Sequence, residues 1–213
     1  MNMVRRPMPR VRVLNANGSA PVRAVVLVLH GGQEHSKSRA RRLYPAYLRM
    51  LPFGYDLRRA GRDRGVAVWL LRNRYRGWNR PDLDPVADAR WAIARIRRAH
   101  PDVPVALVGH SMGARVALRV ADEPGVVAVC ALAPWTTEDD HVEHLAGKAV
   151  LIAHGDRDTT TRPVDSLAFA ERARQVSDTV RRLDIRGEGH AMLRRPREWT
   201  RLVRGFVLAA FEL

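Results

Sequence analysis

Short apolar runs recur along the chain, each about as long as a β-strand and free of charged side chains. Continuous runs of this kind are typical of strands that are buried on both faces of a sheet. A strand-like alternation at 10–15 and a more polar run at 179–185 predict two further strands. The apolar runs themselves lie at 24–29, 66–71, 105–108, 126–132 and 149–153.

Helical patterns fill the segments between these runs. Asp84 is typical of a helix N-cap and Pro85 of the first helical position, and apolar residues then recur at spacings of three and four. Further helices are expected at 43–60 and 165–174. A final helix is predicted by an apolar stripe at Trp199, Leu202, Val203, Phe206, Val207 and Ala210.

Buried strands that alternate with helices predict an α/β fold, in which a mostly parallel, doubly wound sheet carries helices on both faces. The strands at 10–15 and 24–29 are expected to form a hairpin around the turn cluster at 15–19. All 213 residues are expected to form one domain, with 1–9 as a flexible N-terminal segment. Chemistry in such a sheet gathers at the carboxyl ends of the strands.

One stretch combines a buried strand, a tight turn and a helix. The apolar run at 105–108 is followed by the turn G-H-S-M-G at 109–113, and helical spacing follows the turn. A G-x-S-x-G turn in this context is typical of a nucleophilic serine, here Ser111, because a side chain at either glycine would crowd the neighbouring elements. The N–H of Met112 would then point from the helix N-terminus at a developing oxyanion. The alternative is a glycine-rich turn with an idle serine.

A serine hydroxyl is a weak nucleophile until a base takes its proton and a third group holds that base. His190 is the candidate base, because Gly187 and Gly189 just before it let its loop bend freely. The acid is Asp158 or Asp156, which follow the same predicted strand. Asp158 is preferred, because it lies deeper in the loop that must reach His190, and Asp156 is expected to shape the turn.

The other histidines are not expected to take part in the chemistry. Three of them stand beside a glycine at a strand end and are predicted to be packing residues: His30, His110 and His154. Four lie in polar segments and are predicted to be solvated: His35, His100, His141 and His144. His141 and His144 flank Glu143, but this spacing falls short of a zinc site, so neither a metal nor a cofactor is expected.

Together these residues resemble the α/β-hydrolase superfamily, and the resemblance spans roughly 22–211. The matching stretches are His30-Gly31-Gly32, the turn at 109–113, His154-Gly155-Asp156-Arg157-Asp158 and Gly189-His190. About 15 residues, 134–148, separate two strands between which many members of the superfamily insert a helical cap. The resemblance therefore implies a compact α/β-hydrolase fold without a cap domain.

The resemblance also implies roles for individual residues. Ser111 would be the nucleophile, Asp158 the acid and His190 the base. The oxyanion hole would consist of the backbone N–H groups of Met112 and Gly32, with Gln33 as the alternative if the loop is shifted by one residue. The site would be open, with walls from loops that carry Gln33, Tyr75, Trp78 and Trp135.

The formal net charge of +15 would ordinarily suggest a nucleic acid or a membrane surface as the partner. The 35 arginines are scattered along the chain, however, as a coding bias would leave them, so no nucleic-acid partner is expected. No apolar stretch approaches the length of a membrane span and no signal peptide is visible, so the expected location is cytoplasmic. The single cysteine, Cys130, lies in an apolar run and is expected to be a buried thiol.

The sequence therefore predicts a serine hydrolase that cleaves a carboxylic ester or thioester, with a small or extended acyl group, through an acyl-enzyme. An amidase or peptidase on the same residues is one alternative, and a binding protein without catalytic activity is another. The sequence does not indicate an oligomeric state. Six arginines that follow the strand ends predict a preference for anionic substrates: Arg72, Arg74, Arg76, Arg157, Arg194 and Arg195. The alternative, which the sequence leaves open, is that they are solvated side chains produced by the same coding bias.

Overall fold

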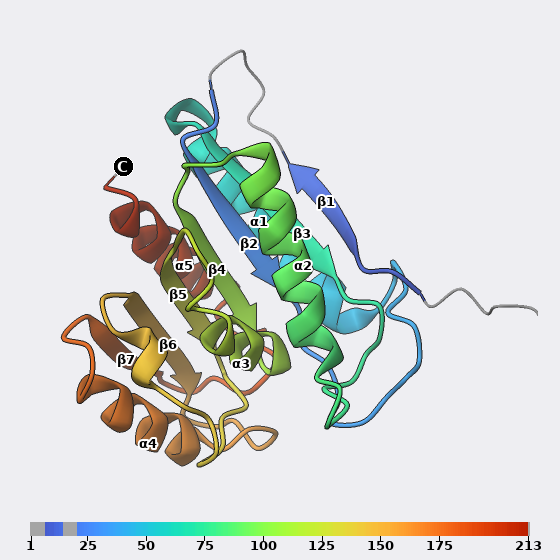
Figure 1. The fold of residues 1–213 in the computed structure, drawn as a ribbon. Coiled ribbons are helices and arrows are strands. Elements are labelled where there is room, and N and C mark those ends of the chain that lie inside the picture. Colours follow the sequence, from blue (N-terminus) through green and yellow to red (C-terminus); the bar gives the residue numbers. More distant parts are fainter. Residues whose placement is uncertain (1–6, 15–20, 213) are drawn as a thin grey trace, which may run out of the picture.

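One seven-stranded sheet forms the centre of the protein (Figure 1), and the computed structural model describes residues 7–14 and 21–212. The strands are β1 (Arg10–Leu14), β2 (Ala24–Leu29), β3 (Val66–Arg72), β4 (Val105–His110), β5 (Val126–Leu132), β6 (Ala149–Gly155) and β7 (Val180–Ile185). They lie in the order β1-β3-β2-β4-β5-β6-β7, and every neighbouring pair is parallel except β1 and β3. The predicted parallel α/β architecture is confirmed.

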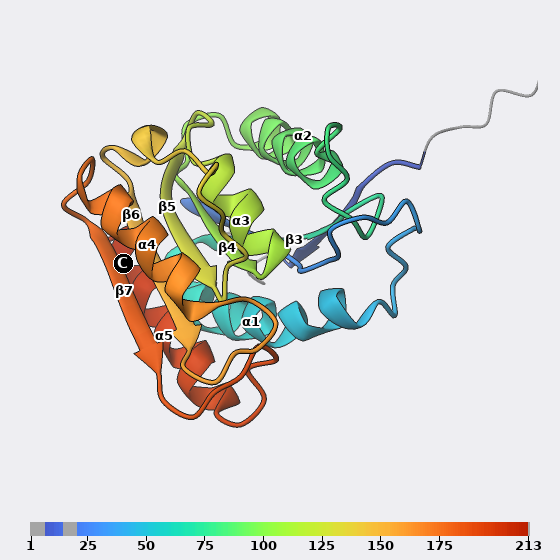
Figure 2. The same ribbon diagram turned by 90° about the horizontal axis from the view of Figure 1, so that it is seen from below.

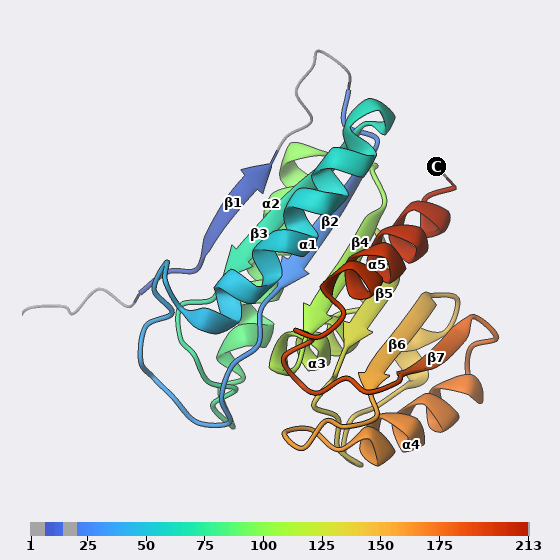
Figure 3. The same cartoon turned by 180° about the vertical axis from the view of Figure 1, so that it is seen from behind.

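Helices cover both faces of this sheet, as Figures 2 and 3 show. They are α1 (Pro45–Gly61), α2 (Asp84–Ala99), α3 (Met112–Arg119), α4 (Pro163–Arg174) and α5 (Pro196–Ala210). Apolar residues of α1 and α5 form one core with the sheet, and those of α2, α3 and α4 form the other. Successive residues of β2 alternate between the two cores, so that Val26 packs with α1 and Leu27 with α2 and α3.

The prediction of a hairpin between the first two strands is wrong. β1 pairs antiparallel with β3, with Val13 opposite Trp69, and β3 separates β1 from β2. All residues of β2 are buried, which suits a central strand with a neighbour on each edge, whereas β1 is largely exposed and suits an edge. The turn cluster at 15–19 and residues 1–6 of the expected flexible segment lie outside the described residues.

The start of α2 also differs from the prediction. Leu83, in the left-handed region with a φ of 48°, takes the N-cap position, and Asp84 and Pro85 are the first two helical residues. The Asp84 carboxylate binds the ammonium of Lys37 at 2.7 Å and accepts a hydrogen bond from the Asn79 amide at 2.9 Å. The sequence pattern predicted that the Asp84 side chain caps the helix, but in the structure this side chain binds Lys37 and Asn79 instead.

The connection from β5 to β6 forms no cap, as predicted. Its only helical element in the described chain is a short 3₁₀ helix, Glu143–Leu145, and a second 3₁₀ helix, Arg62–Arg64, precedes β3. Within the described chain, no separate domain therefore covers the loops at the carboxyl edge of the sheet. Among residues 7–14 and 21–212 there is also no helix long and apolar enough to cross a membrane.

The parallel strands point the same way in Figure 1, so their carboxyl ends meet at one edge of the sheet, which Figure 2 shows from below. The turn after β4, the loop after β6 and the loop after β7 all leave from this edge. Segments that are distant in sequence are thereby brought together, as is expected of such sheets.

Candidate active site

A strained turn presents Ser111 at the carboxyl end of β4. Ser111 has a φ of 55° and a ψ of −121°, a backbone conformation that residues other than glycine rarely adopt. A Cβ added at Gly109 would lie 2.3 Å from the carbonyl oxygen of Gly113, and one added at Gly113 would lie 2.5 Å from the carbonyl oxygen of Leu29. Both glycines are therefore required by the close approach of β4, α3 and β2.

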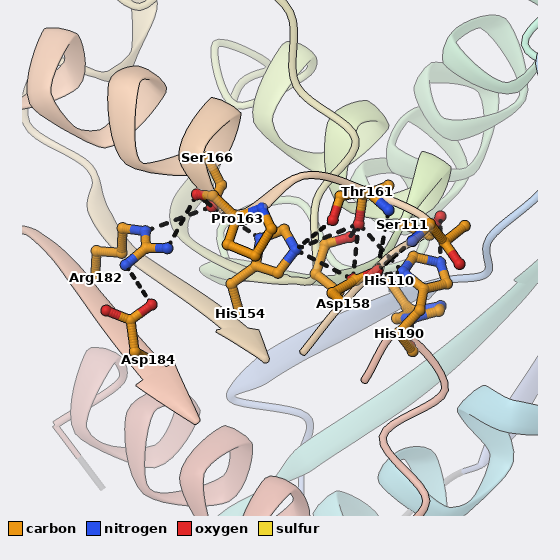
Figure 4. A network of polar contacts seen from close by, with 12 residues as sticks. His110, Ser111, His154, Asp158, Thr161, Pro163, Ser166, Arg182, Asp184 and His190 are labelled. Atoms are coloured by element: carbon orange, nitrogen blue, oxygen red, sulfur yellow. Dashed lines mark hydrogen bonds and ion pairs between the residues drawn. The ribbon is translucent and has the colours of Figure 1, made fainter. Parts of the chain in front are cut away.

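Three side chains from the three carboxyl-edge loops meet beside this turn (Figure 4). Oγ of Ser111 lies 3.0 Å from Nε2 of His190, and Nδ1 of His190 lies 2.8 Å from Oδ2 of Asp158. Ser111 and Asp158 are buried, and 16% of the His190 side chain is exposed. Asp156 takes no part in this group, since its exposed carboxylate instead accepts a hydrogen bond from the N–H of Gly187 at 2.6 Å. The structure thus brings Asp158, and not Asp156, to His190.

The Asp158 carboxylate receives hydrogen bonds from several directions. Oδ1 accepts the N–H groups of Thr160 and Thr161 at 2.8 and 3.0 Å. Oδ2 accepts the Thr161 hydroxyl at 2.9 Å and lies 3.1 Å from Nε2 of His154. Burial by itself would raise the pKa of Asp158, but the hydrogen bonds from His154, His190 and the two N–H groups outweigh it and hold the pKa far below its usual value. The carboxylate is therefore ionised at neutral pH.

His154 and Thr161 belong to this arrangement, although the sequence reasoning did not find them. His154 is fully buried, and its Nδ1 lies 2.8 Å from Oγ of Ser166. Thr161 Oγ1 lies 3.1 Å from Nδ1 of His190. The available signal was their position in the acid loop, four residues before and three residues after Asp158. The packing role predicted for His154 is incomplete, because this side chain also contacts the carboxylate.

Two buried histidines, His110 and His30, are neutral at neutral pH. The ring centroid of His110 lies 4.7 Å from that of His190, and its Nε2–H donates to the His190 carbonyl oxygen at 2.9 Å. Complete burial, followed by the neighbouring His190, lowers the pKa of His110 to about 3. Burial likewise lowers the pKa of His30 to about 4, and Nε2 of His30 accepts the N–H of Asn73. Both rings are buried, as predicted, and His110 also holds the backbone at His190.

Two backbone N–H groups near Ser111 are available as donors. Met112 is the first residue of α3, so its N–H has no acceptor within the helix. A Cβ at Gly32 would lie 2.2 Å from the Arg76 carbonyl oxygen and 2.5 Å from the Met112 side chain, so the loop after β2 packs directly on Met112. The N–H of Gly32 has no partner in the described part of the chain. Gln33, the alternative donor, already gives its N–H to the Arg76 carbonyl oxygen at 2.8 Å.

The residues predicted to wall the site lie in different environments. Gln33 is exposed and Tyr75 is half-buried. Trp78 is only 1% exposed, and its ring centroid lies 6.0 Å from that of the half-buried Trp135. The guanidinium of the buried Arg115 lies 4.5 Å from the Trp78 ring centroid and 4.6 Å from that of Trp135. The structure therefore places Trp78 in the core, packed on a buried cation, rather than on an open wall.

The arginines predicted to form a basic rim are only partly free. Arg74 binds the buried carboxylate of Asp88 at 2.5 Å, and Arg195 binds Glu198 at 3.2 Å. No ion pair within the described residues involves the other predicted rim residues, Arg72, Arg76, Arg157 and Arg194. The uncompensated positive charge at this edge is smaller than the sequence suggested.

The remaining side chains singled out from the sequence take no part in this arrangement. Cys130 is buried, as predicted, and burial raises the pKa of its thiol. His35 and His141 are exposed, whereas His100 and His144 are half-buried, against prediction. The His144 ring N–H donates to the Leu118 carbonyl oxygen at 2.7 Å, and the His100 ring packs edge-on against Trp69. No group of three or more His, Cys, Asp and Glu side chains among the described residues could hold a metal ion.

Solved structures share this fold. XC6422 from Xanthomonas campestris, described as an α/β serine hydrolase without lid, has a TM-score of 0.69 at 19% identity, over 94% of this chain and 88% of its own. Est1E from Butyrivibrio proteoclasticus has a TM-score of 0.71 at 14% identity, over 96% and 95%. An α/β serine hydrolase homologue from Coxiella burnetii has a TM-score of 0.69 at 18% identity, over 92% and 90%. At these identities the likeness shows the fold alone.

A family model gives the more specific assignment. The model described as serine aminopeptidase, S33, matches residues 20–149, which is more than half of the chain. A search of curated proteins found no match. The matched segment contains the loop after β2 and the whole turn around Ser111. This chain therefore belongs to the serine aminopeptidase S33 family of hydrolases, within the α/β-hydrolase superfamily.

Proposed function

We propose that this protein is a serine hydrolase that cleaves a carboxylic ester or thioester through an acyl-enzyme. The observation that carries the proposal is the pair of hydrogen bonds that links Ser111 through His190 to Asp158, with lengths of 3.0 and 2.8 Å. Structural neighbours described as esterases or lipases support an ester substrate, among them a Pyrococcus furiosus esterase and a Paleococcus ferrophilus monoacylglycerol lipase.

In the proposed acylation step His190 acts as the general base. Its Nε2 takes the proton from Oγ of Ser111 while that oxygen attacks the carbonyl carbon of the substrate. The carbonyl oxygen becomes an oxyanion and accepts hydrogen bonds from the N–H groups of Gly32 and Met112. When the tetrahedral intermediate collapses, the bond to the alcohol or thiol breaks, and His190 returns the proton to that leaving group. The acyl group stays on Ser111.

Deacylation uses the same groups with water as the nucleophile. His190 takes a proton from the water, the hydroxyl oxygen attacks the acyl carbon, and the proton passes to Ser111 Oγ as the carboxylic acid leaves. Asp158 remains ionised throughout, because hydrogen bonds hold its pKa low, and it stabilises each imidazolium that forms. The neutral His110, whose ring lies tilted against that of His190, adds no positive charge against that imidazolium.

An amidase or peptidase on the same residues is the second candidate, since the family description names an aminopeptidase. An enzyme that selects a free N-terminal ammonium needs negative groups close to the reacting atoms. Arg49 is close enough to His110 to lower its pKa. The Asp158 carboxylate is already bound by His190 and by the N–H groups of Thr160 and Thr161. These local contacts disfavour a cationic substrate, so the ester or thioester is preferred. A binding protein without catalytic activity would need none of the linked side chains.

Labelling with a fluorophosphonate probe tests the proposed nucleophile. The intact mass of the wild-type protein and of the Ser38→Ala variant, which changes an exposed serine, should increase by one probe adduct. The Ser111→Ala variant should remain unlabelled and should lose most of its hydrolytic activity, apart from a residual rate due to the backbone donors. Equal labelling of Ser111→Ala would remove Ser111 from the proposed role.

A matched substrate series tests the class of bond. An ester, a thioester and an anilide of the same short acyl group should be compared by kcat/KM. Hydrolysis of the ester and the thioester, with the anilide much slower, is the expected result. Cleavage of aminoacyl anilides with a free N-terminus at a higher kcat/KM than the ester and the thioester would favour an aminopeptidase.

A further inference from the structure

Two adjoining hollows lie outside the candidate active site, where the start of β1 meets the end of β3. Their volumes are about 430 and 640 Å³, which is the size range of small-molecule sites. They share three lining arginines, Arg10, Arg42 and Arg72. Neither lining includes Ser111 or His190. The two hollows thus adjoin each other at these arginines and are distinct from the residues proposed to carry out hydrolysis.

The charge of these hollows is of one sign. Arg39, Arg41 and Arg74 also line the smaller hollow, and no Asp or Glu lines either one. Arg74 is neutralised by Asp88, but no ion pair in the described chain involves Arg10 or Arg42. Residues 1–6 and 15–20, outside the described ranges, contain no Asp or Glu that could supply a side-chain carboxylate. The arginines therefore lack the compensation that Asp140 gives to the buried Arg115.

The shared arginines also repel one another. Partial burial, followed by the charges of Arg10 and Arg42, lowers the pKa of Arg72. Guanidinium groups of like charge that line the same hollows raise the free energy of the empty site, and an anion placed between them would lower it. The planar N–H donors of arginine also match the oxygens of a phosphate group.

The larger hollow has an apolar part beside these arginines. Leu43, just before α1, is 81% exposed, and Leu48, in its first turn, is 38% exposed. The half-buried Leu51 lies about one turn further on. All three line the hollow together with the shared arginines. Exposed leucines next to unpaired cations leave a surface with one charged end and one apolar end.

We propose that the two hollows form one binding site for an amphiphilic phosphate monoester. Its head group, with a charge between −1 and −2, binds Arg10, Arg42 and Arg72, and its aliphatic tail lies on Leu43, Leu48 and Leu51. Multiple guanidinium groups favour a phosphate over a singly charged head group, since each can donate to one of several oxygens. The apolar part distinguishes the ligand from free inorganic phosphate.

Calorimetric titration with decyl phosphate, kept below its micelle-forming concentration, tests the site. The titration uses the full chain carrying Ser111→Ala, so the outcome is independent of the proposed hydrolysis. The added pair Arg10→Gln and Arg42→Gln should weaken binding by about tenfold or more, because charge-assisted hydrogen bonds are lost. The control pair Arg59→Gln and Arg98→Gln removes the same charge from exposed helix positions and should change binding by less than about twofold.

The apolar part is tested separately with inorganic phosphate and a Leu43→Ser variant. Inorganic phosphate should bind more weakly than decyl phosphate, and Leu43→Ser should weaken the binding of decyl phosphate alone. The proposal is overturned if decyl phosphate fails to bind, if both arginine pairs weaken it equally, or if the two phosphates bind with the same affinity. Equal weakening would mean that net charge alone attracts the anion.

Discussion

Substitution of Asp158 by asparagine changes the charge at the centre of the candidate site with almost no change in shape. Oδ1 of the native carboxylate accepts the N–H groups of Thr160 and Thr161, so an asparagine oxygen is expected to take that place. The amide NH₂ then replaces Oδ2 and faces Nδ1 of His190, which lies 2.8 Å away in the native protein. The NH₂ group can only donate, so Nδ1 must become the acceptor and the ring proton moves to Nε2. In that tautomer His190 cannot accept the proton of Ser111.

The expected losses can be estimated for activity and for stability. The wrong tautomer lowers kcat by about 10⁴-fold in the best-studied serine protease, and we expect a loss of this order here. Stability should fall as well, because Oδ2 also accepts the Thr161 hydroxyl at 2.9 Å and lies 3.1 Å from Nε2 of His154. The loss of hydrogen bonds to a charged group costs about 1.5–3 kcal/mol each, so the free energy of unfolding should drop by at least that amount.

The pH dependence of stability gives an independent check on Asp158. Its pKa is depressed in the folded protein, so its contribution is present above the unfolded-state pKa of about 4 and is lost as the pH falls below that value. In Asp158→Asn the difference from wild type should therefore shrink as the pH is lowered from neutral into the acid range. Urea unfolding at several pH values measures this difference.

Asp156→Asn is the matched control for both assays. Its exposed carboxylate accepts one N–H, that of Gly187, so the free energy of unfolding should change by about 0.5 kcal/mol or less and kcat by less than about tenfold. Ester hydrolysis under saturating substrate provides kcat for both variants. If Asp156→Asn lost more activity than Asp158→Asn, the assignment of the acid and the tautomer argument would both be refuted.

Three further outcomes are expected. His110→Gln keeps an N–H donor for the His190 carbonyl oxygen whereas His110→Leu does not, so kcat should fall by about tenfold or more only in the leucine variant. Equal losses of kcat in the two variants would contradict the positioning of His190 by His110. Burial raises the pKa of Asp88 to about 6, so the contribution of this carboxyl to stability is complete below about pH 4 and is lost as the pH rises through 6. Over that window, the free energy of unfolding of the wild type, measured in urea, should fall by about 3 kcal/mol relative to Asp88→Asn. With no cap over the site, hydrolysis of lipid emulsions should show no rate jump at the solubility limit, and a jump would refute the open site.

The sheet and the turn around Ser111 were predictable because each is specified by residues that are adjacent in sequence. A run such as 24–29 needs burial on both faces wherever it lies, and Gly109 and Gly113 fit a turn that tolerates no side chain at either end. The choice of Asp158 over Asp156 was predictable for a geometric reason, since the later residue lies further along the loop. Local sequence constraints carry this information without knowledge of the tertiary contacts.

The errors concern contacts between segments that are distant in sequence. β1 pairs with β3 rather than with β2, and no local pattern distinguishes one hydrogen-bonding edge from another. Trp78 resembles an exposed loop aromatic until Arg115, from α3, is placed against its ring. The solvated state predicted for His144 failed in the same way, because its acceptor is a carbonyl oxygen 26 residues earlier in the chain. Each of these outcomes depends on which partner the fold supplies.

Electrostatics at the site show most clearly why composition alone is a poor guide to function. A net charge of +15 should oppose the formation of an imidazolium at His190. Two unit charges 4 Å apart interact by roughly 4 kcal/mol near a protein surface, so the immediate neighbours outweigh arginines more than a Debye length away. Those neighbours are the buried, ionised Asp158 and the neutral His110. The fold thus surrounds the proposed base with a negative environment inside a strongly basic protein, and the arginines remain free to act at other surfaces.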